Sequence, residues 1–164
     1  MLTLPRQTER GPQRYVAVRR KVKMPFGDAV GPSFGELFAA FANAGVAADG
    51  MEFIKYNLID MPDLEIEIGM TTDAAIPLSG ALMEGELPGG RYIETTYTGP
   101  YDDLYDVTAM LIGWAKERGI RWDMEETSEG DRFAARLEHY HNNPVDEPDP
   151  AKLRTTLLFK LASG

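Results

Sequence analysis

The stretch Arg91-Tyr92-Ile93-Glu94-Thr95-Thr96-Tyr97-Thr98-Gly99-Pro100 decides the fold of this chain. Its β-branched and aromatic residues are typical of a strand, and the Gly-Pro pair introduces a helix with proline near the first turn. A similar strand start, Arg14-Tyr15-Val16, lies 77 residues earlier, since 91 − 14 = 77. The sequence therefore suggests that one structural unit occurs twice.

The first copy of this unit begins with Tyr15-Val16-Ala17-Val18, which reads as a strand. Pro32-Ser33-Phe34-Gly35-Glu36 then opens a helix, because Ser33 can cap its N-terminus and Glu36 completes a capping box. Gly45 supplies a C-terminal stop. Two strands follow, over 52–58 and 63–70, and the second alternates apolar with acidic residues as a half-buried strand does.

The second copy repeats this order of elements. The strand over 91–97 leads into a helix that begins at Thr98-Gly99-Pro100 and ends at Gly119. Strands are expected around 133–142 and 155–161. Six residues at helical spacing should form the buried stripe of the helix: Leu104, Tyr105, Thr108, Leu111, Ile112 and Ala115.

These elements predict an α+β fold. It is a pseudo-two-fold tandem repeat of β-α-β-β units, with antiparallel sheets backed by helices around a central cleft. The half-repeats span about 14–70 and 91–162 of a single domain, 14–162, and the Pro- and Gly-rich residues 71–90 connect them. Residues 1–13 are expected to form a flexible lead-in.

Composition limits the classes of function. The 164 residues carry a net charge of −9, with 26 acidic and 17 basic side chains, and the acidity lies beyond a basic N-terminal segment. An acidic body repels phosphate backbones, so direct nucleic-acid binding is not expected. No apolar run approaches the roughly 18 residues of a membrane span. There is no cysteine, which fits a reducing compartment, so a cytoplasmic protein is expected.

The candidate functional stretch is Leu137-Glu138-His139-Tyr140-His141-Asn142-Asn143-Pro144. In a strand, Glu138 and Tyr140 share one face, and the two histidines share the other. If the Glu138 face lines a cavity, an anionic group lies beside an aromatic one. That pair suits a cationic or electrophilic small molecule.

Four segments in order resemble the GyrI-like small-molecule-binding family, which also supplies effector-binding domains to bacterial multidrug-responsive transcription regulators. The segments are Leu87-Pro88-Gly89-Gly90-Arg91-Tyr92, Tyr97-Thr98-Gly99-Pro100-Tyr101-Asp102-Asp103-Leu104, Glu138-His139-Tyr140-His141-Asn142-Asn143-Pro144 and Leu153-Arg154-Thr155-Thr156-Leu157. The resemblance implies the stand-alone form of the family. It also implies a central cleft with a glutamate at its bottom that faces hydrophobic cations, and Glu138 takes that position.

Five aromatic residues are candidate partners of Glu138 in ligand binding. Tyr140 follows from strand alternation, and Tyr56 from the match of Lys55-Tyr56-Asn57 with His139-Tyr140-His141. Tyr97 and Trp114 follow from the resemblance, and Tyr15 begins the strand equivalent to the one at Tyr92. For each ring, ordinary packing is an equal alternative.

Three functions compete for this site. The favoured one is binding of lipophilic or cationic small molecules, for sensing or sequestration. The second is hydrolysis of strained, cyclopropane-bearing toxins, with Glu138 and Tyr140 as acid–base catalysts. The third is a protective interaction with gyrase, or with a regulator partner, through the acidic surface.

Other polar groups have simpler explanations. The pair His139 and His141 lacks a third ligand, so no metal site is predicted, and no motif for a cofactor occurs. Glu65 and Glu67 are interpreted as a solvated strand face. Phe34, Phe38 and Phe41 are assigned to the core by their helical spacing, without a function.

Overall fold

The computed structural model describes residues 1–163. It contains two α-helices and ten strands, with short 3-10 turns at Tyr101–Asp103 and Pro150–Lys152. In chain order, the elements are β1 (Arg6–Arg10), β2 (Gln13–Lys23), α1 (Gly27–Asn43), β3 (Glu52–Asp60), β4 (Asp63–Thr71), β5 (Leu82–Leu87), β6 (Gly90–Thr98), α2 (Leu104–Glu117), β7 (Met124–Thr127), β8 (Gly130–Phe133), β9 (Arg136–Tyr140) and β10 (Arg154–Lys160).

The strands form one antiparallel sheet in the order β1-β6-β10-β9-β3-β4-β2-β5, and the β7–β8 hairpin attaches to β3. One half of the sheet contains β2-β4-β3 and the other contains β6-β10-β9. The halves meet where β3 pairs with β9. Each half has a helix after its first strand, which confirms the predicted α+β class with helix-backed antiparallel strands. The internal sequence repeat stays a prediction.

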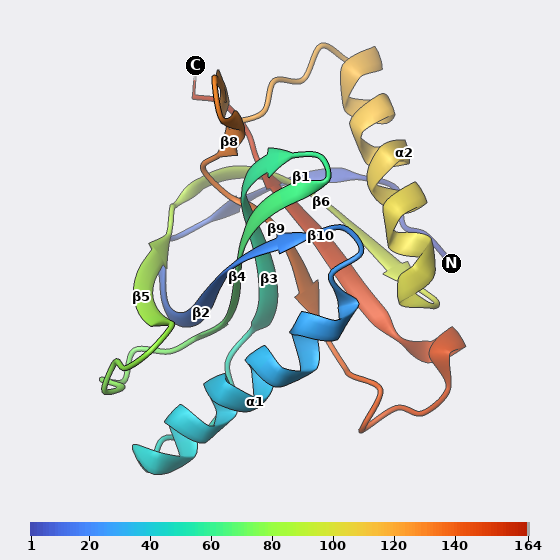
Figure 1. Ribbon diagram of the computed structural model, residues 1–164. Coiled ribbons are helices and arrows are strands. Elements are labelled where there is room, and N and C mark those ends of the chain that lie inside the picture. Colours follow the sequence, from blue (N-terminus) through green and yellow to red (C-terminus); the bar gives the residue numbers. More distant parts are fainter. Residues whose placement is uncertain (164) are drawn as a thin grey trace.

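Both helices pack on one face of this curled sheet. In Figure 1 they are splayed apart, with β3, β9 and β10 visible between them. α1 buries Leu37 and Phe41 against β2 and β4, and α2 buries Val107 and Leu111 against β6 and β10. The other face encloses a separate core: Tyr15, Ala17, Phe53, Leu87, Tyr92, Ala135, Leu137 and Leu158. Strands β2, β6 and β10 therefore contribute side chains to both cores, and strand alternation decides which core a side chain enters.

The N-terminal segment corrects one prediction. Residues 1–13 were expected to be a flexible lead-in, but Arg6–Arg10 form β1 and pair with β6. Arg6 and Arg10 each contact the Glu94 carboxylate, at 2.6 and 3.4 Å. The basic charges of this segment therefore have a partner inside the protein. The connector 71–90 likewise contributes a strand, β5, which pairs with β2.

The position at which α1 begins corrects a second prediction, that of a capping box at Ser33 and Glu36. The helix begins at Gly27, so Ser33 lies inside it as a buried residue and Pro32 lies in its second turn. The capping-box pattern is local, whereas the position of this helix is set by packing of its apolar face on the sheet. Both helices end before the glycines expected as stops, and Gly45 and Gly119 have φ of 68° and 65°. This is the left-handed conformation that glycine adopts readily.

The buried face of α2 differs from the predicted stripe. The residues that are buried against the sheet are Leu104, Val107, Leu111 and Ala115. Tyr105 and Ile112 were predicted on the same stripe but are 68% and 37% exposed. They lie on the neighbouring side of the helix, because one position further along a helix turns a side chain by about 100°. No helix among residues 1–163 is long and apolar enough to cross a membrane.

Candidate functional site

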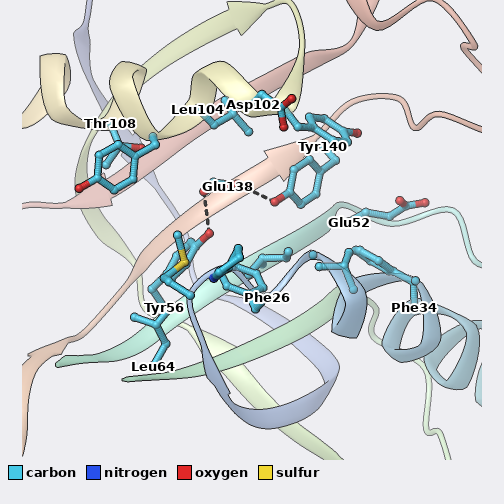
Figure 2. A pocket seen from close by; sticks show the side chains of 18 of the residues that line it. Phe26, Phe34, Glu52, Tyr56, Leu64, Asp102, Leu104, Thr108, Glu138 and Tyr140 are labelled. Carbon is cyan, nitrogen blue, oxygen red and sulfur yellow. Dashed lines mark hydrogen bonds between the residues drawn. The ribbon is translucent and has the colours of Figure 1, made fainter. Parts of the chain in front are cut away.

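A cavity of about 1270 Å³ lies between α1 and α2, above the strands where the two halves of the sheet meet. Figure 2 shows this cleft with Phe34 of α1 and Leu104 and Thr108 of α2 on its walls. The volume is sufficient for a drug-sized organic molecule. The walls are mostly apolar, and they include Met24, Phe26, Val30, Phe38, Ile59, Met61, Leu64, Ile112 and Phe159.

The floor of the cleft consists of alternate residues of β9 and β3. Arg136, Glu138 and Tyr140 share one face of β9, and all three line the cavity. On β3, Ile54 is paired with Glu138, and Glu52 is paired with Tyr140. The carboxylate at the middle of the floor therefore lies directly on the junction of the two halves.

Two tyrosine hydroxyls hold the Glu138 carboxylate. Tyr56 on β3 donates to Oε1 at 2.7 Å, and Tyr140 on β9 donates to Oε2 at 2.6 Å. Figure 2 shows both bonds, one from Tyr56 and the other from Tyr140. Among residues 1–163, no lysine, arginine or histidine nitrogen lies within 4.0 Å of this carboxylate. Within the described part of the chain, Glu138 is thus held by neutral donors and has no ion-pair partner.

The electrostatics of Glu138 follow from this environment. Burial raises the pKa of the Glu138 carboxyl above its ordinary value of 4.5, although the hydrogen bonds from Tyr140 and Tyr56 and the charge of Arg136 oppose the rise. Burial and the adjacent carboxylate also raise the pKa values of the Tyr56 and Tyr140 hydroxyls. The hydroxyls therefore stay protonated and continue to act as donors. A cation in the cleft would favour the ionised form of Glu138.

Aromatic rings surround this carboxylate. Tyr140 makes edge-to-face contacts with Tyr101 and Phe34, at centroid distances of 5.5 and 6.4 Å. Tyr56 makes a similar contact with Phe26 at 6.1 Å. Because four of the five rings come from outside β9, elements far apart in the sequence assemble the aromatic box. Such a box attracts cations through the faces of its rings.

The floor also carries other charged groups. The Arg136 guanidinium lies 4.7 to 5.9 Å from the ring centroids of Phe159, Phe133 and Tyr56. At the other end of the floor, burial and the nearby charge of Asp146 raise the pKa of Glu52. Asp102 and Asp146 also line this part of the cleft.

The structure brings together three of the six residues predicted for the site. Glu138, Tyr140 and Tyr56 meet as described, whereas Tyr15, Tyr97 and Trp114 do not line the cavity. Their predicted place in the cleft is wrong.

Each of these three aromatic residues has another environment. Tyr15 points to the opposite face of the sheet, where its hydroxyl donates to the buried Glu67. Tyr97 donates to Asp103, and Trp114 packs under the Arg118 guanidinium at 4.4 Å. The interpretation of Glu67 as a solvated residue is also wrong, because its side chain is only 2% exposed.

Several residues of the site were missed by the sequence analysis. Phe34 and Phe38 were assigned to the core, yet both line the cleft. Arg136 could have been found, because it lies two residues before Glu138 and strand alternation gives both the same face. Phe26 and Tyr101 had no local signal, since they reach the cleft only through the packing of the loop before α1 and the turn before α2.

Comparisons with known proteins agree with this architecture. The C-terminal domain of EcmrR has a TM-score of 0.73 and 17% identity, over 98% of both chains. EcmrR in its complex with DNA gives a TM-score of 0.69 and 14% identity over 98% of this chain, which spans 58% of that longer chain. A hydrolase from Listeria innocua has a TM-score of 0.63 and 14% sequence identity, over 96% of this chain and 91% of that one.

SAV2435 bound to tetraphenylphosphonium gives a TM-score of 0.58 and 10% identity, over 98% of this chain and 95% of that one. At such low identities, these likenesses show a shared fold. No curated protein sequence matches the chain. The family model described as the GyrI-like small molecule binding domain matches residues 4–162. With its cleft, fold and sequence in agreement, the chain belongs to the GyrI-like family of small-molecule-binding domains.

Proposed function

We propose that this protein binds amphipathic, cationic small molecules in the cleft between α1 and α2, with Glu138 as the electrostatic anchor. The observation that carries the proposal is the state of Glu138: a carboxylate on the floor of a largely apolar cavity, held by two neutral hydroxyls and without a basic side chain within 4.0 Å among residues 1–163. Binding of this kind serves sensing and sequestration equally.

The energetics favour a cation over a neutral guest. An ionised carboxylate removed from water without a counter-charge costs several kcal/mol, or it takes up a proton. A bound cation offsets this cost, so ionisation of Glu138 and binding reinforce each other. Well-placed rings such as Tyr56, Tyr140 and Phe34 add about 0.5–2 kcal/mol each through cation–π attraction. A permanently charged, lipophilic molecule gains from both effects.

Tetraphenylphosphonium tests this proposal, because its charge does not depend on pH and its phenyl groups are apolar. It is also the molecule to which SAV2435, a protein of the same fold, is bound. Isothermal titration calorimetry with the purified chain should show saturable binding. Glu138→Gln should weaken the affinity by about 30-fold or more, the counterpart of about 2 kcal/mol lost from a buried charge contact.

The matched control is Glu86→Gln, which removes an exposed carboxylate from β5, outside the cleft. It changes the net charge by the same amount and should leave the affinity within about twofold, since screening weakens distant surface charges. Equal losses in both variants would assign binding to overall charge. If both variants keep the wild-type affinity, Glu138 does not contribute to cation binding.

A second candidate function is hydrolysis of strained electrophiles, favoured by one observation. A carboxyl group with a raised pKa lies between two phenols in a cavity that could hold the substrate. Glu138 could accept a proton from water while the water oxygen attacks a cyclopropane carbon. The ring carbon–carbon bond would break, and the other carbon would receive a proton.

Product formation separates the two functions. Mass spectrometry of a cyclopropane-bearing compound after incubation would show a gain of one water for the enzyme, with loss of turnover in Glu138→Gln. Saturable binding without a change in mass assigns the chain to binding alone.

A further inference from the structure

The Arg136 guanidinium has an unusual position on the floor of the cleft. It is half-buried and lies between the rings of Phe133, Phe159 and Tyr56. Among residues 1–163, no carboxylate oxygen lies within 4.0 Å of it, and its side-chain N–H groups have no hydrogen-bond acceptor. The rings compensate part of the charge, but ring faces leave the N–H donors without strong acceptors.

The charges of the cleft are separated along its floor. Arg136 lies at the end marked by Tyr56, whose own ring packs in a cluster with Leu64 and Phe26. The acidic groups Glu52, Asp102 and Asp146 lie at the end marked by Tyr140. In Figure 2, Tyr56 and Leu64 lie on one side of Glu138, and Glu52 lies on the other.

The strand geometry gives the spacing of these charges. Arg136 and Glu138 are two residues apart on β9, which corresponds to roughly 7 Å. Glu52 is paired with Tyr140, four residues from Arg136, so it lies on the order of 13 Å from Arg136 along the floor. One elongated molecule of drug size can reach both ends of such a floor.

We infer that Arg136 is a specificity-determining residue, which binds a hydrogen-bond acceptor, above all a carboxylate, at the opposite end of the ligand from its cationic group. The inference rests on the proposed function, in which Glu138 and the acidic end of the cleft hold the cation. The preferred ligand class is therefore dipolar or zwitterionic with an apolar body. A guanidinium presents a planar pair of N–H donors that matches a carboxylate, and such bonds are stronger than those between neutral groups.

Two probes that differ by one group test this inference. Butyltriphenylphosphonium carries only the cation, and (4-carboxybutyl)triphenylphosphonium adds a carboxylate at the end of the same alkyl chain. Calorimetry at pH 7 gives the ratio of their affinities for each variant. The wild-type chain should bind the carboxylated probe about tenfold more tightly, the gain expected for a charge-assisted hydrogen bond.

Arg136→Gln should reverse this preference, because the carboxylate of the probe would then have no cation to pair with and would still be repelled by Glu138, two residues along β9, while the plain cation should bind at least as tightly as before. Arg136→Lys keeps the charge but loses the planar pair of donors, so it should retain part of the preference. Arg132→Gln on β8, an exposed guanidinium outside the cleft, is the matched control and should keep the wild-type ratio.

The outcomes separate this inference from the proposed function. If the wild-type chain binds the plain cation but gains nothing from the added carboxylate, the role of Arg136 is overturned and the cation site stands. If it binds neither probe, the proposed function fails as well. An unchanged ratio in Arg136→Gln would also overturn the inference. The wild-type ratio needs no variant, so the test remains decisive if Arg136→Gln does not fold.

Discussion

Two glutamates beneath the surface of this protein, Glu67 and Glu138, have opposite environments. Glu67 accepts hydrogen bonds from Tyr15 and Asn57, and it has two cations, Lys55 and Arg19, each 3.6 Å away. Burial would raise its pKa, but these cations and donors outweigh that effect, and the pKa of Glu67 is lowered.

Glu138 likewise accepts hydrogen bonds from two neutral donors, but among residues 1–163 no cation lies within 4.0 Å of it, and its pKa is raised. The comparison shows how a buried carboxylate that completes the fold differs from one that is available to a ligand. Glu67 has two cations 3.6 Å away within the protein, whereas the cavity that Glu138 faces places no cation of residues 1–163 within 4.0 Å of its carboxylate. Hydrogen bonds from tyrosine occur at both sites, so these bonds do not distinguish the two glutamates. The distance to the nearest cation distinguishes them.

The largest expected effect comes from removing the counter-charge of Glu67. Lys55→Met leaves a buried carboxylate whose nearest remaining cation is the half-exposed Arg19, so the free energy of unfolding should fall by about 3–5 kcal/mol. Urea denaturation measures this change. Lys23→Met is the matched control, because Lys23 also pairs with a carboxylate, that of Asp63 at 2.6 Å, but in water.

The Lys23→Met variant should lose no more than about 1 kcal/mol. If both lysine variants lose a similarly small free energy of unfolding, the burial of Glu67 does not depend on its cations. The proposed difference between Glu67 and Glu138 would then be wrong.

The second effect is the pH dependence of cation binding. Because the pKa of Glu138 is raised above 4.5, part of the carboxyl is protonated in weakly acidic solution, and only the ionised form attracts a cation. Affinity for tetraphenylphosphonium should rise with pH, by up to about tenfold per unit below the pKa, and then level off. Calorimetry between pH 5 and 8 measures the curve.

The same shift has the opposite sign for stability in the ligand-free protein. Ionisation of Glu138 disfavours the folded state, so its contribution to stability is greatest below the ordinary carboxyl value and falls as pH rises through the raised pKa. Glu138→Gln should give a flat binding curve. An affinity that falls with increasing pH in the wild-type chain would contradict the assignment of Glu138 as the anchor.

A smaller effect, on the pH midpoint of cation affinity, tests the role of the Tyr56 and Tyr140 hydroxyls. Tyr56→Phe or Tyr140→Phe removes one donor to the Glu138 carboxylate, so the carboxyl pKa should rise further. The midpoint of the pH curve for cation affinity should move upward by about one pH unit, which corresponds to about 1.4 kcal/mol. Tyr105→Phe, at the exposed edge of the cleft, should leave the midpoint in place. A midpoint unmoved in all three variants would contradict the role of the donors.

The smallest effect concerns the stability of Glu138→Gln. The amide can still bond to Tyr56 and Tyr140, and the cost of burying a charge disappears, so the free energy of unfolding should stay within about 1 kcal/mol of wild type. Glu67→Gln should be clearly less stable, because the buried Lys55 ammonium would lose its counter-charge. Urea denaturation of both variants gives the comparison. If Glu138→Gln loses more than Glu67→Gln, Glu138 is a structural residue.

The sequence predicted the parts of this site that depend on strand periodicity. Alternation correctly placed Glu138 and Tyr140 on one face of β9, and the match between Lys55-Tyr56-Asn57 and His139-Tyr140-His141 pointed to Tyr56. Tyr15 was misplaced because the beginning of β2 gives no local sign of which face of the sheet it occupies. Only the pairing of Ala17 with Gly69 and of Arg19 with Glu67 fixes that face.

Glu67 is a second residue whose environment could not be predicted from the local sequence pattern. Its alternation with Ile66 and Ile68 was read correctly, but the face opposite to the helices was taken as solvent. The curling of the sheet turns that face into a second core, and curvature is a property of all the strands together. The cations that make its burial possible come from β2 and β3, so no local pattern indicates them.

The strand β1 has a consequence for how the molecule meets others. It belongs to the start of the chain, yet it extends the sheet beyond β6, in the half formed by the end of the chain. Without it, β6 would present a free row of backbone donors and acceptors, the surface on which sheets of separate molecules join and aggregate. β1 occupies that row and becomes the edge itself, a strand of only five residues that carries Arg6 and Arg10, and charged side chains on a short edge strand disfavour pairing with another sheet.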